Sequence, residues 1–366
     1  MKFSILRETL LPELQIIISV VDRRQSLPIL ANVLFNSTGQ GFSLTATDME
    51  VELVASKDEP LGSTGQVTIP ARKLLDICRS LPESAKLEFD ASKDRVQLKS
   101  GKSRFSLASQ PAQEFPLTDI EDFPVNFKIA QGVFRSLLED TLFAMAQQDV
   151  RYYLNGLLLE IGPEKLRAVA TDGHRLALKE VDISSNVTDT LQIIVPRKGV
   201  MELVRLVGDT EDPVEVYVST NHIRFQIGHI RFTSKLIDGK FPDYERVIPK
   251  DSGNHMIADR ETLRQSLNRA SILSNEKYRG IRLEVKEGSL RAEAQNPEQE
   301  EAEEVIQVEY SGDPMEIGFN VSYLLDAIGA IKTEKVNVVL TDANSSCLIL
   351  PQDESQCKYV VMPMRL

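Results

Sequence analysis

Short runs in which apolar and polar residues alternate recur along the chain, and they predict half-buried β-strands. Four such runs begin at Phe42, Val51, Val96 and Phe105. Between the runs lie segments in which apolar residues return every three or four positions, the spacing that gives an α-helix one apolar face. Because both patterns occur in the same stretches of chain, they predict an α+β fold.

The pattern occurs three times at a constant spacing. Ala46-Thr47-Asp48 recurs 124 positions later as Ala170-Thr171-Asp172, and an altered copy, Ala294-Gln295-Asn296, follows after another 124. Each copy lies at a turn between two alternating runs. A period of this length is far greater than the roughly 20–50 residues of a solenoid repeat. We therefore predict three copies of one domain.

Each predicted domain contains two helices at equivalent positions. Pro12 leaves the start of the very first helix open, because proline is accepted only in a first turn. The third copy of this helix follows 129 positions after the second, which we attribute to a longer linker at Gln147–Tyr153. The expected apolar faces are Leu10, Leu14, Ile17, Ile18 and Val21, then Phe134, Leu138 and Met145, then Leu263 and Leu267 for the first helix, and Leu74, Cys78 and Leu81, then Val200, Val204 and Val207, then Leu324, Ile328 and Ile331 for the second.

Two proline residues mark the ends of the first two domains. Pro116 and Pro242 each follow a phenylalanine and lie about one period apart. We predict domains at residues 1–124, 125–248 and 249–366. Domains related by a constant rotation build either an open filament or a closed ring, and the ring is the soluble solution. Ring closure requires complementary surfaces at the two ends of the chain.

Charged residues could supply these surfaces. The first domain carries a basic run with Lys102 and Arg104, whereas residues 298–304 of the third domain form an acidic run that continues into a strand-like segment. Two edge strands of opposite charge could pair between subunits. Alternatively, the acidic run is only a solvated face. The predicted interface comprises Lys73, Arg95, Lys102, Arg104, Phe105, Leu107, Ile272, Leu273, Glu298, Glu300, Glu301 and Glu304.

Composition narrows the classes of function. The 366 residues carry a net charge of −12, which argues against a protein that grips nucleic acid by bulk electrostatics. Any contact with DNA must therefore be local or indirect. Cys78, Cys347 and Cys357 include no Cys-x-x-Cys pair of the kind that binds metal. The apolar stretch Ile16–Val21 is too short to span a membrane, and nothing targets the chain for export. We expect a cytoplasmic protein with no metal or cofactor.

From end to end, the chain resembles the beta subunit of bacterial DNA polymerase III, the sliding clamp family. The motifs that carry the resemblance are Leu27–Leu30, Val67–Lys73, Gln148–Gly156, Thr171–Leu176, Phe241–Tyr244, Asn296–Glu301 and Val360–Leu366.

The resemblance implies a homodimer of three-domain subunits, closed head to tail into a ring with helices lining the hole and antiparallel sheets outside. It implies a processivity factor without catalytic activity, since the polymerase and 3'-5' exonuclease activities belong to partners. The implied partners are double-stranded DNA, the DNA polymerase III alpha subunit, the clamp loader delta subunit, and other polymerases and repair proteins that carry clamp-binding peptides. No membrane partner is implied. A ring holds DNA by topology, so it needs only weak contacts with phosphate, in agreement with the acidic composition.

The resemblance also implies two further sets of site residues. Basic residues near the helices and a glutamine–tyrosine group are expected to contact DNA: Arg24, Arg72, Gln148, Tyr152, Tyr153, Arg197 and Lys198. A hydrophobic cleft between the second and third domains is expected to bind partner peptides through Leu154, Thr171, Gly173, His174, Arg175, Leu176, Pro242, Arg246, Val247, Asn320, Ser346, Val360, Val361, Met362, Pro363, Met364, Arg365 and Leu366.

Plainer interpretations accompany these assignments. Tyr152 and Tyr153 could pack at a strand end, or stack on single-stranded bases. Val360–Met364 could be a last edge strand on its own core rather than part of a groove. An enzyme would use Asp172 and His174 as an acid–base pair, but Asp172-Gly173 has a turn explanation and no nucleophile recurs near it. A scaffold that never meets DNA is the stronger rival.

Overall fold

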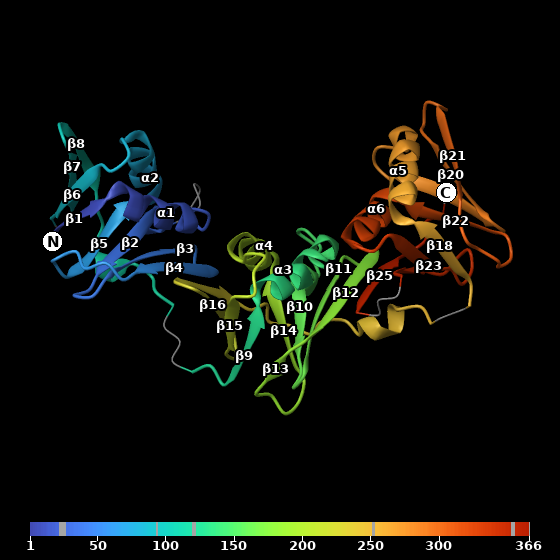
Figure 1. Ribbon diagram of the computed structural model, residues 1–366, viewed down its shortest axis with the longest axis horizontal. Helices are drawn as coiled ribbons and strands as arrows, with labels where there is room; N and C mark the ends of the chain where they lie inside the picture. Colours follow the sequence, from blue (N-terminus) through green and yellow to red (C-terminus); the bar gives the residue numbers. More distant parts are fainter. Residues whose placement is uncertain (22–26, 93, 119–121, 251–252, 353–355, 366) are drawn as a thin grey trace. The chain divides into compact units, whose positions relative to one another are not determined.

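The computed structural model describes residues 1–366 except 22–26, 93, 119–121, 251–252, 353–355 and 366. The chain forms two compact units, Met1–Gly132 with Met201–Leu236, and Val133–Val200 with Ile237–Leu366 (Figure 1). The division between the units falls inside the second repeat.

The same order of strands and helices occurs three times, which confirms the predicted α+β repeat. Each repeat runs strand, helix, four strands, helix, three strands, and the second adds a short strand, β13 (Ser184–Ser185). The first repeat contains β1 (Lys2–Leu6), α1 (Arg7–Ile17), β2 (Asn32–Ser37), β3 (Phe42–Thr47), β4 (Val51–Lys57), β5 (Gly65–Pro70), α2 (Ala71–Ser80), β6 (Lys86–Ala91), β7 (Arg95–Ser100) and β8 (Ser103–Ala108).

The second and third repeats follow the same order. The second contains β9 (Val125–Ala130), α3 (Gln131–Glu139), β10 (Gly156–Ile161), β11 (Lys165–Thr171), β12 (Arg175–Asp182), β14 (Leu191–Pro196), α4 (Arg197–Leu206), β15 (Pro213–Val218), β16 (His222–Ile227) and β17 (Ile230–Lys235). The third contains β18 (His255–Asp259), α5 (Arg260–Ala270), β19 (Gly280–Lys286), β20 (Ser289–Gln295), β21 (Glu301–Gln307), β22 (Met315–Asn320), α6 (Val321–Ala330), β23 (Lys335–Val339), β24 (Cys347–Pro351) and β25 (Cys357–Val361). Short 3-10 turns include η3 (Leu142–Ala144), η4 (Tyr152–Leu154), η5 (Tyr244–Val247) and η6 (Ser271–Leu273).

Every repeat forms two four-stranded antiparallel sheets. A terminal sheet holds the first strand and the last three, as in β1-β6-β7-β8, and a central sheet holds the middle four, as in β22-β19-β20-β21. Within the first unit, β4 of the first central sheet pairs with β17 of the second terminal sheet. Within the second unit, β12 pairs with β25 in the same way. Consecutive repeats are therefore joined by continuous sheets, and β8 and β21 remain as edge strands of the described sheets (Figure 1).

The repeated Ala-Thr-Asp motif forms a hairpin turn stabilised by its own side chains. The Asp48 carboxylate accepts hydrogen bonds from the amides of Glu50 and Val51, and the Thr47 hydroxyl donates to the Val51 carbonyl. Asp172 and Thr171 make the equivalent bonds to residues 174 and 175. Such side chains replace the backbone partners that a tight turn leaves unsatisfied. This confirms the turn explanation for Asp172 and removes the basis for an acid–base role.

The predicted helix faces are buried, but the helices end earlier than the apolar pattern suggested. Leu10, Leu14 and Ile17 are inaccessible to solvent, and Pro12 lies inside α1. Ile18 and Val21 follow the end of α1, and Met145 follows η3. Leu81 and Ile331 are the C-cap residues of α2 and α6. In α4, Val200 and Leu203 are buried and the predicted Val204 is only partly buried, while Val207 is buried just after the helix. Buried loop residues continue a helical spacing because they cover the same core.

Candidate functional sites

The predicted cleft residues of the second unit meet where β12 begins and β25 ends. Arg175 is paired with Val361, and Leu176 with Val360, along the antiparallel ladder. The Met362 amide then donates a hydrogen bond of 2.9 Å to the His174 carbonyl. These backbone bonds bring together the predicted hairpin residues and the predicted C-terminal residues, which are almost 190 positions apart.

β25 is an interior strand. It lies between β12 and β24, so the interpretation of Val360–Met364 as a last edge strand was wrong. The amino-acid composition of this segment could not show that its strand lies in the interior of a sheet, because the neighbouring strand β12 belongs to another repeat.

An apolar cluster forms the floor of this region. Leu154, Leu176 and Val360 are almost fully buried and pack with Phe241 and Tyr244. Above the buried floor, Val247 and Met362 expose about half of their surface, 55% and 47% respectively. Apolar side chains that remain exposed beside a buried apolar floor are typical of a peptide-binding surface.

The C-terminal residues continue across the third repeat. The Met364 amide donates a 2.7 Å hydrogen bond to the carbonyl of Gly318 on β22. Two residues later, the Asn320 side chain caps α6 by accepting from the Ser322 amide. Met364 and Asn320 are thus brought to one region, as predicted. A hollow of about 670 Å³ adjoins it, lined in part by Tyr278, Met364, Arg365 and the β21 residues 301–303.

Tyr323 on α6 belongs to this region, although sequence reasoning missed it. Its ring lies 6.4 Å from the His174 ring at an interplanar angle of 21°. The sequence pattern identified only the buried face of α6, and Tyr323 lies beside that face rather than on it. Its position three residues after Asn320, at the start of the helix, is the signal that could have indicated it.

The other predicted cleft residues lie near this region along the chain, but they are not members of the apolar cluster. Arg246 is highly exposed and pairs with Asp243. Ser346 directly precedes Cys347, which is paired with Val361. Thr171 and Gly173 belong to the hairpin turn, while Pro242 lies two residues before η5 and Pro363 lies between Met362 and Met364. Leu366 lies outside the described residues.

Among the residues predicted to contact DNA, two arginines are hydrogen-bonded to backbone carbonyls of the chain, whereas a glutamine and a tyrosine are exposed. Arg72 donates to the Val21 carbonyl and Arg197 to the Met145 carbonyl, so each guanidinium group already ties a helix to a preceding loop of its own repeat. Tyr153 packs against the apolar cluster, whereas Tyr152 is 57% exposed. Gln148 is also exposed. Lys198 is the second residue of α4, and Arg24 lies outside the described residues.

The two edge strands carry opposite charge. On β8, Arg104 is exposed, Phe105 is partly buried and Leu107 is buried, while the Arg95 guanidinium on β7 reaches the Ser106 hydroxyl. Lys102 is exposed in the turn before β8, and Lys73 is exposed on α2. β21 begins inside the predicted acidic run, at Glu301, with Glu298 and Glu300 in the preceding turn.

The third repeat adds an exposed apolar side chain beside its edge strand. Ile272 on η6 is 74% exposed, and Leu273 is half-buried next to it. Glu304 already forms a two-bond ion pair with Arg269 in its own repeat, at 2.9 and 2.6 Å. This hydrogen bonding lowers the pKa of Glu304. Glu303 also pairs within its own chain, with Arg291 at 3.2 Å, but it is more exposed than Glu304, 56% against 24%, and is the better candidate partner for a basic residue from another chain.

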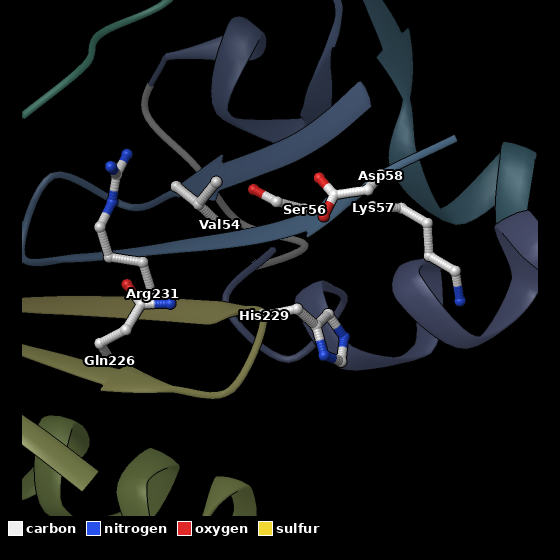
Figure 2. Close-up of a pocket in the computed structure, with 7 residues that line it drawn as sticks. All are labelled: Val54, Ser56, Lys57, Asp58, Gln226, His229 and Arg231. Atoms are coloured by element: carbon white, nitrogen blue, oxygen red, sulfur yellow. The ribbon is translucent and has the colours of Figure 1, made fainter. Parts of the chain in front are cut away.

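A further hollow of about 380 Å³ lies in the first unit, at the junction of β4 and β17 (Figure 2). Lys57 and His229 line it, and both reach the Glu13 carboxylate on α1. The His229 Nε2 is 3.0 Å and the Lys57 Nζ 3.8 Å from this carboxylate, which is only 3% exposed. The Lys57 and His229 side chains are therefore directed at a buried carboxylate rather than at the open hollow.

We expect His229→Ala to lower the stability of the first unit by about 1–2 kcal/mol, because a buried carboxylate loses its hydrogen-bond donor. The change is measured by thermal unfolding. Adding Glu13→Leu should recover part of the loss, since the equivalent residue of the second repeat is the buried Leu137. His222→Ala on the neighbouring strand is the matched control. If His229→Ala and His222→Ala unfold alike, the ion pair contributes nothing.

No helix among the described residues is long and apolar enough to cross a membrane. The same part of the chain contains no cluster of three or more His, Cys, Asp or Glu side chains that could hold a metal ion.

Comparison with known proteins gives a consistent result. Models of the N-terminal, central and C-terminal domains of the DNA polymerase III beta subunit match residues 1–119, 128–243 and 245–365. The beta sliding clamp of Pseudomonas aeruginosa is 52% identical, with 100% of both chains covered. A crystal structure of the P. aeruginosa DNA polymerase sliding clamp with ligand matches at a TM-score of 0.97 and 51% identity, again over 100% of both chains. Another, bound to griselimycin, matches at a TM-score of 0.95 and 52% identity with the same coverage.

Proposed function

The chain belongs to the DNA polymerase III beta subunit family, and we propose that two copies of it close head to tail into a ring around duplex DNA. As a member of this family it is a sliding clamp, a processivity factor of DNA replication with no catalytic activity of its own. The boundaries 1–124, 125–248 and 249–366 are proposed as the three clamp domains.

The sheet topology supports ring closure. Each junction within the chain joins the third strand of a central sheet to the last strand of the following terminal sheet, β4 to β17 and β12 to β25. The third central sheet ends at β21 and the first terminal sheet ends at β8, so a second copy supplies the missing partner for each. This repetition of one junction is the observation that carries the proposal.

The internal junctions also indicate the register between subunits. Glu52 faces Thr233 at one junction, and Leu176 faces Val360 at the other. By their positions in their own hairpins, Glu301 is equivalent to Glu52 and Leu176, and Ser106 is equivalent to Thr233 and Val360. Pairing Glu301 with Ser106 sets Phe105 opposite Ala302 and Arg104 opposite Glu303.

This register accounts for both the apolar and the charged residues of the edge strands. Directly opposed side chains in an antiparallel pair have Cβ atoms about 4.5–5.5 Å apart, so Arg104 and Glu303 would form a cross-strand ion pair. Phe105 and Leu107 would turn toward the side of β21 that packs on α5, where the exposed Ile272 is available to cover them. Lys73, Arg95 and Lys102 would surround the acidic strand with positive charge.

DNA would pass through the ring with weak contacts. We propose Arg24, Arg72, Gln148, Tyr152, Tyr153, Arg197 and Lys198 as the contacting residues. The exposure of Gln148 and Tyr152 supports their part in this set. A ring needs little affinity for phosphate, because its topology prevents dissociation, and a net charge of −12 is compatible with this mode of retention.

The cleft would receive short peptides from the DNA polymerase III alpha subunit, the clamp loader delta subunit, and other polymerases and repair proteins. Its apolar floor and exposed Val247 and Met362 support an apolar peptide ligand. Griselimycin, bound to the related clamp, is proposed as a ligand of the same cleft. Because these partners act on DNA, we propose that the protein is cytoplasmic, and its three buried cysteines fit that reducing compartment.

Retention on circular DNA tests the ring. After loading by a clamp loader onto nicked circular DNA, labelled protein is expected to stay with the DNA through gel filtration, and to be lost once the DNA is linearised. The reason is that only a free end lets an intact ring slide off. Release that does not depend on DNA ends would exclude topological retention. No retention on either form would favour a scaffold that does not encircle DNA.

A further inference from the structure

The guanidinium group of Arg175 is held on several sides within the second unit. Its Nε donates to the Asp172 carboxylate at 3.1 Å, and its Nη2 donates to the Phe143 carbonyl at 2.8 Å. Its Nη1 donates to the Asp326 carboxylate. The rings of Phe143 and Tyr323 also lie against it, with centroids 5.4 and 4.5 Å from the guanidinium carbon.

These contacts leave little of Arg175 for a ligand. Its side chain is 13% exposed, whereas the neighbouring His174 is exposed. A guanidinium ion that is largely buried, paired with carboxylates and covered by rings is costly to detach, since hydrogen bonds that involve charged groups are stronger than those between neutral groups. The Arg175 side chain therefore makes its contacts within the chain, although it was predicted to contact the peptide.

The partners of Arg175 come from two different repeats. Phe143 and Asp172 belong to the second repeat, and Tyr323 and Asp326 belong to α6 of the third. The His174 ring stacks on Tyr323 next to this arrangement. Arg175 thus fixes the distance between the hairpin that carries His174 and the helix that carries Tyr323.

The other internal junction lacks this tie. The position of Arg175 is occupied there by Val51, which is paired with Ser234 as Arg175 is paired with Val361. The residue equivalent to Asp326 is Glu202, which binds Arg205 on its own helix. There Arg205 on α4 donates instead to the Ile16 carbonyl and the Ser19 hydroxyl of the first repeat, so the arginine that crosses between repeats lies on the helix at that junction and on the hairpin at the cleft.

We infer that Arg175 and Asp326 are positioning residues for the partner-peptide cleft, which hold the His174–Tyr323 pair in place and do not contact the peptide. The inference rests on the proposed function, because it assigns a role within the proposed cleft. It makes peptide affinity depend on Asp326, a residue outside the predicted contact set.

The test measures binding of a tryptophan-labelled peptide from the clamp-binding segment of the polymerase alpha subunit to the full-length dimer. The chain contains no tryptophan, so the fluorescence reports the peptide alone. Arg175→Lys keeps the charge but cannot serve the same three acceptors. We expect Arg175→Lys and Asp326→Asn each to weaken binding about tenfold, measured at a temperature at which thermal unfolding shows both variants to be fully folded.

A double-mutant cycle separates positioning from direct contact. If Arg175 acts through Tyr323, Arg175→Lys has little further effect once Tyr323→Ala is present, whereas a direct contact gives additive losses. Fluorotyrosine at position 323 adds a ligand-free readout, and its ¹⁹F resonance is expected to shift in Asp326→Asn. The control is Glu139→Gln on α3, which removes the carboxylate of an exposed ion pair with Arg135, leaves the tie intact and should bind the peptide normally.

Three outcomes would overturn the inference: additive losses, an unchanged ¹⁹F resonance, or unchanged affinity of Asp326→Asn. Failure of the unmodified chain to bind the peptide would instead contradict the proposed cleft, so the two failures are distinguishable.

Discussion

Replacing Arg104 by glutamate is expected to convert the dimer into monomers. The register inferred from the two internal junctions sets this residue opposite Glu303 of the partner, with Glu301 on the same exposed face of the strand. The substitution would replace an ion pair by a carboxylate facing carboxylates. Loss of one partner from a close interfacial pair costs about 2–5 kcal/mol, so we expect the dimer Kd to rise by two to three orders of magnitude. Sedimentation velocity over a concentration series measures it.

A reciprocal change tests the register itself. Glu303→Arg in the Arg104→Glu background should restore part of the dimer, whereas Glu304→Arg should not, because Glu304 is held by Arg269. The rescue is expected to be incomplete, since Glu303 also pairs with Arg291 in its own chain at 3.2 Å. Lys86→Glu, on the exposed face of β6 in the same sheet, is the matched charge control. Unchanged sedimentation of Arg104→Glu would contradict the interface.

Deleting the last five residues, 362–366, is expected to abolish peptide binding while the protein stays dimeric. The deletion removes the exposed Met362 side chain and the two backbone bonds that connect the tail to His174 and Gly318. It leaves β25 intact between β12 and β24, so the fold should persist. We expect affinity for the tryptophan-labelled peptide to fall by at least about 100-fold, equivalent to roughly 3 kcal/mol.

The control for the deletion keeps the tail and changes the other end of the same strand. Lys358→Ala lies on β25 but lines a hollow with Arg167 and Glu180, away from the tail. It should bind the peptide normally. Peptide affinity that survives the deletion would contradict the cleft assignment, and loss of the dimer would show that the tail supports folding rather than binding.

Much of the fold could be predicted because local periodicity reflects burial. The alternating runs at Phe42, Val51, Val96 and Phe105 became β3, β4, β7 and β8, and the Ala-Thr-Asp motif became a side-chain-stabilised turn. Helix ends were predicted less well. Met145 continues a helical spacing but lies beyond η3, because a loop that covers a core also needs apolar residues.

The candidate site could be predicted only as a collection of residues. The partners of Arg175 are separated from it by up to 151 positions, and no local pattern connects Phe143, Asp172 and Asp326. Tyr323 was missed for the same reason. Its neighbour His174 lies in another repeat, and helical spacing describes only how a helix meets its own core.

By itself, the sequence determined the threefold repeat, the α+β class, the family and the opposite charge of the two chain ends, because each is a local or periodic property of the residues. Only the tertiary structure decided which strands are edges, which acidic residue remains available for a partner, and which cleft residues are structural. Edge positions depend on pairing between distant strands: β25 is interior because β12 lies beside it, and Glu304 is satisfied because α5 brings Arg269 next to β21. Pairing of this kind is a property of the folded chain, since it is fixed by which surfaces exclude water together.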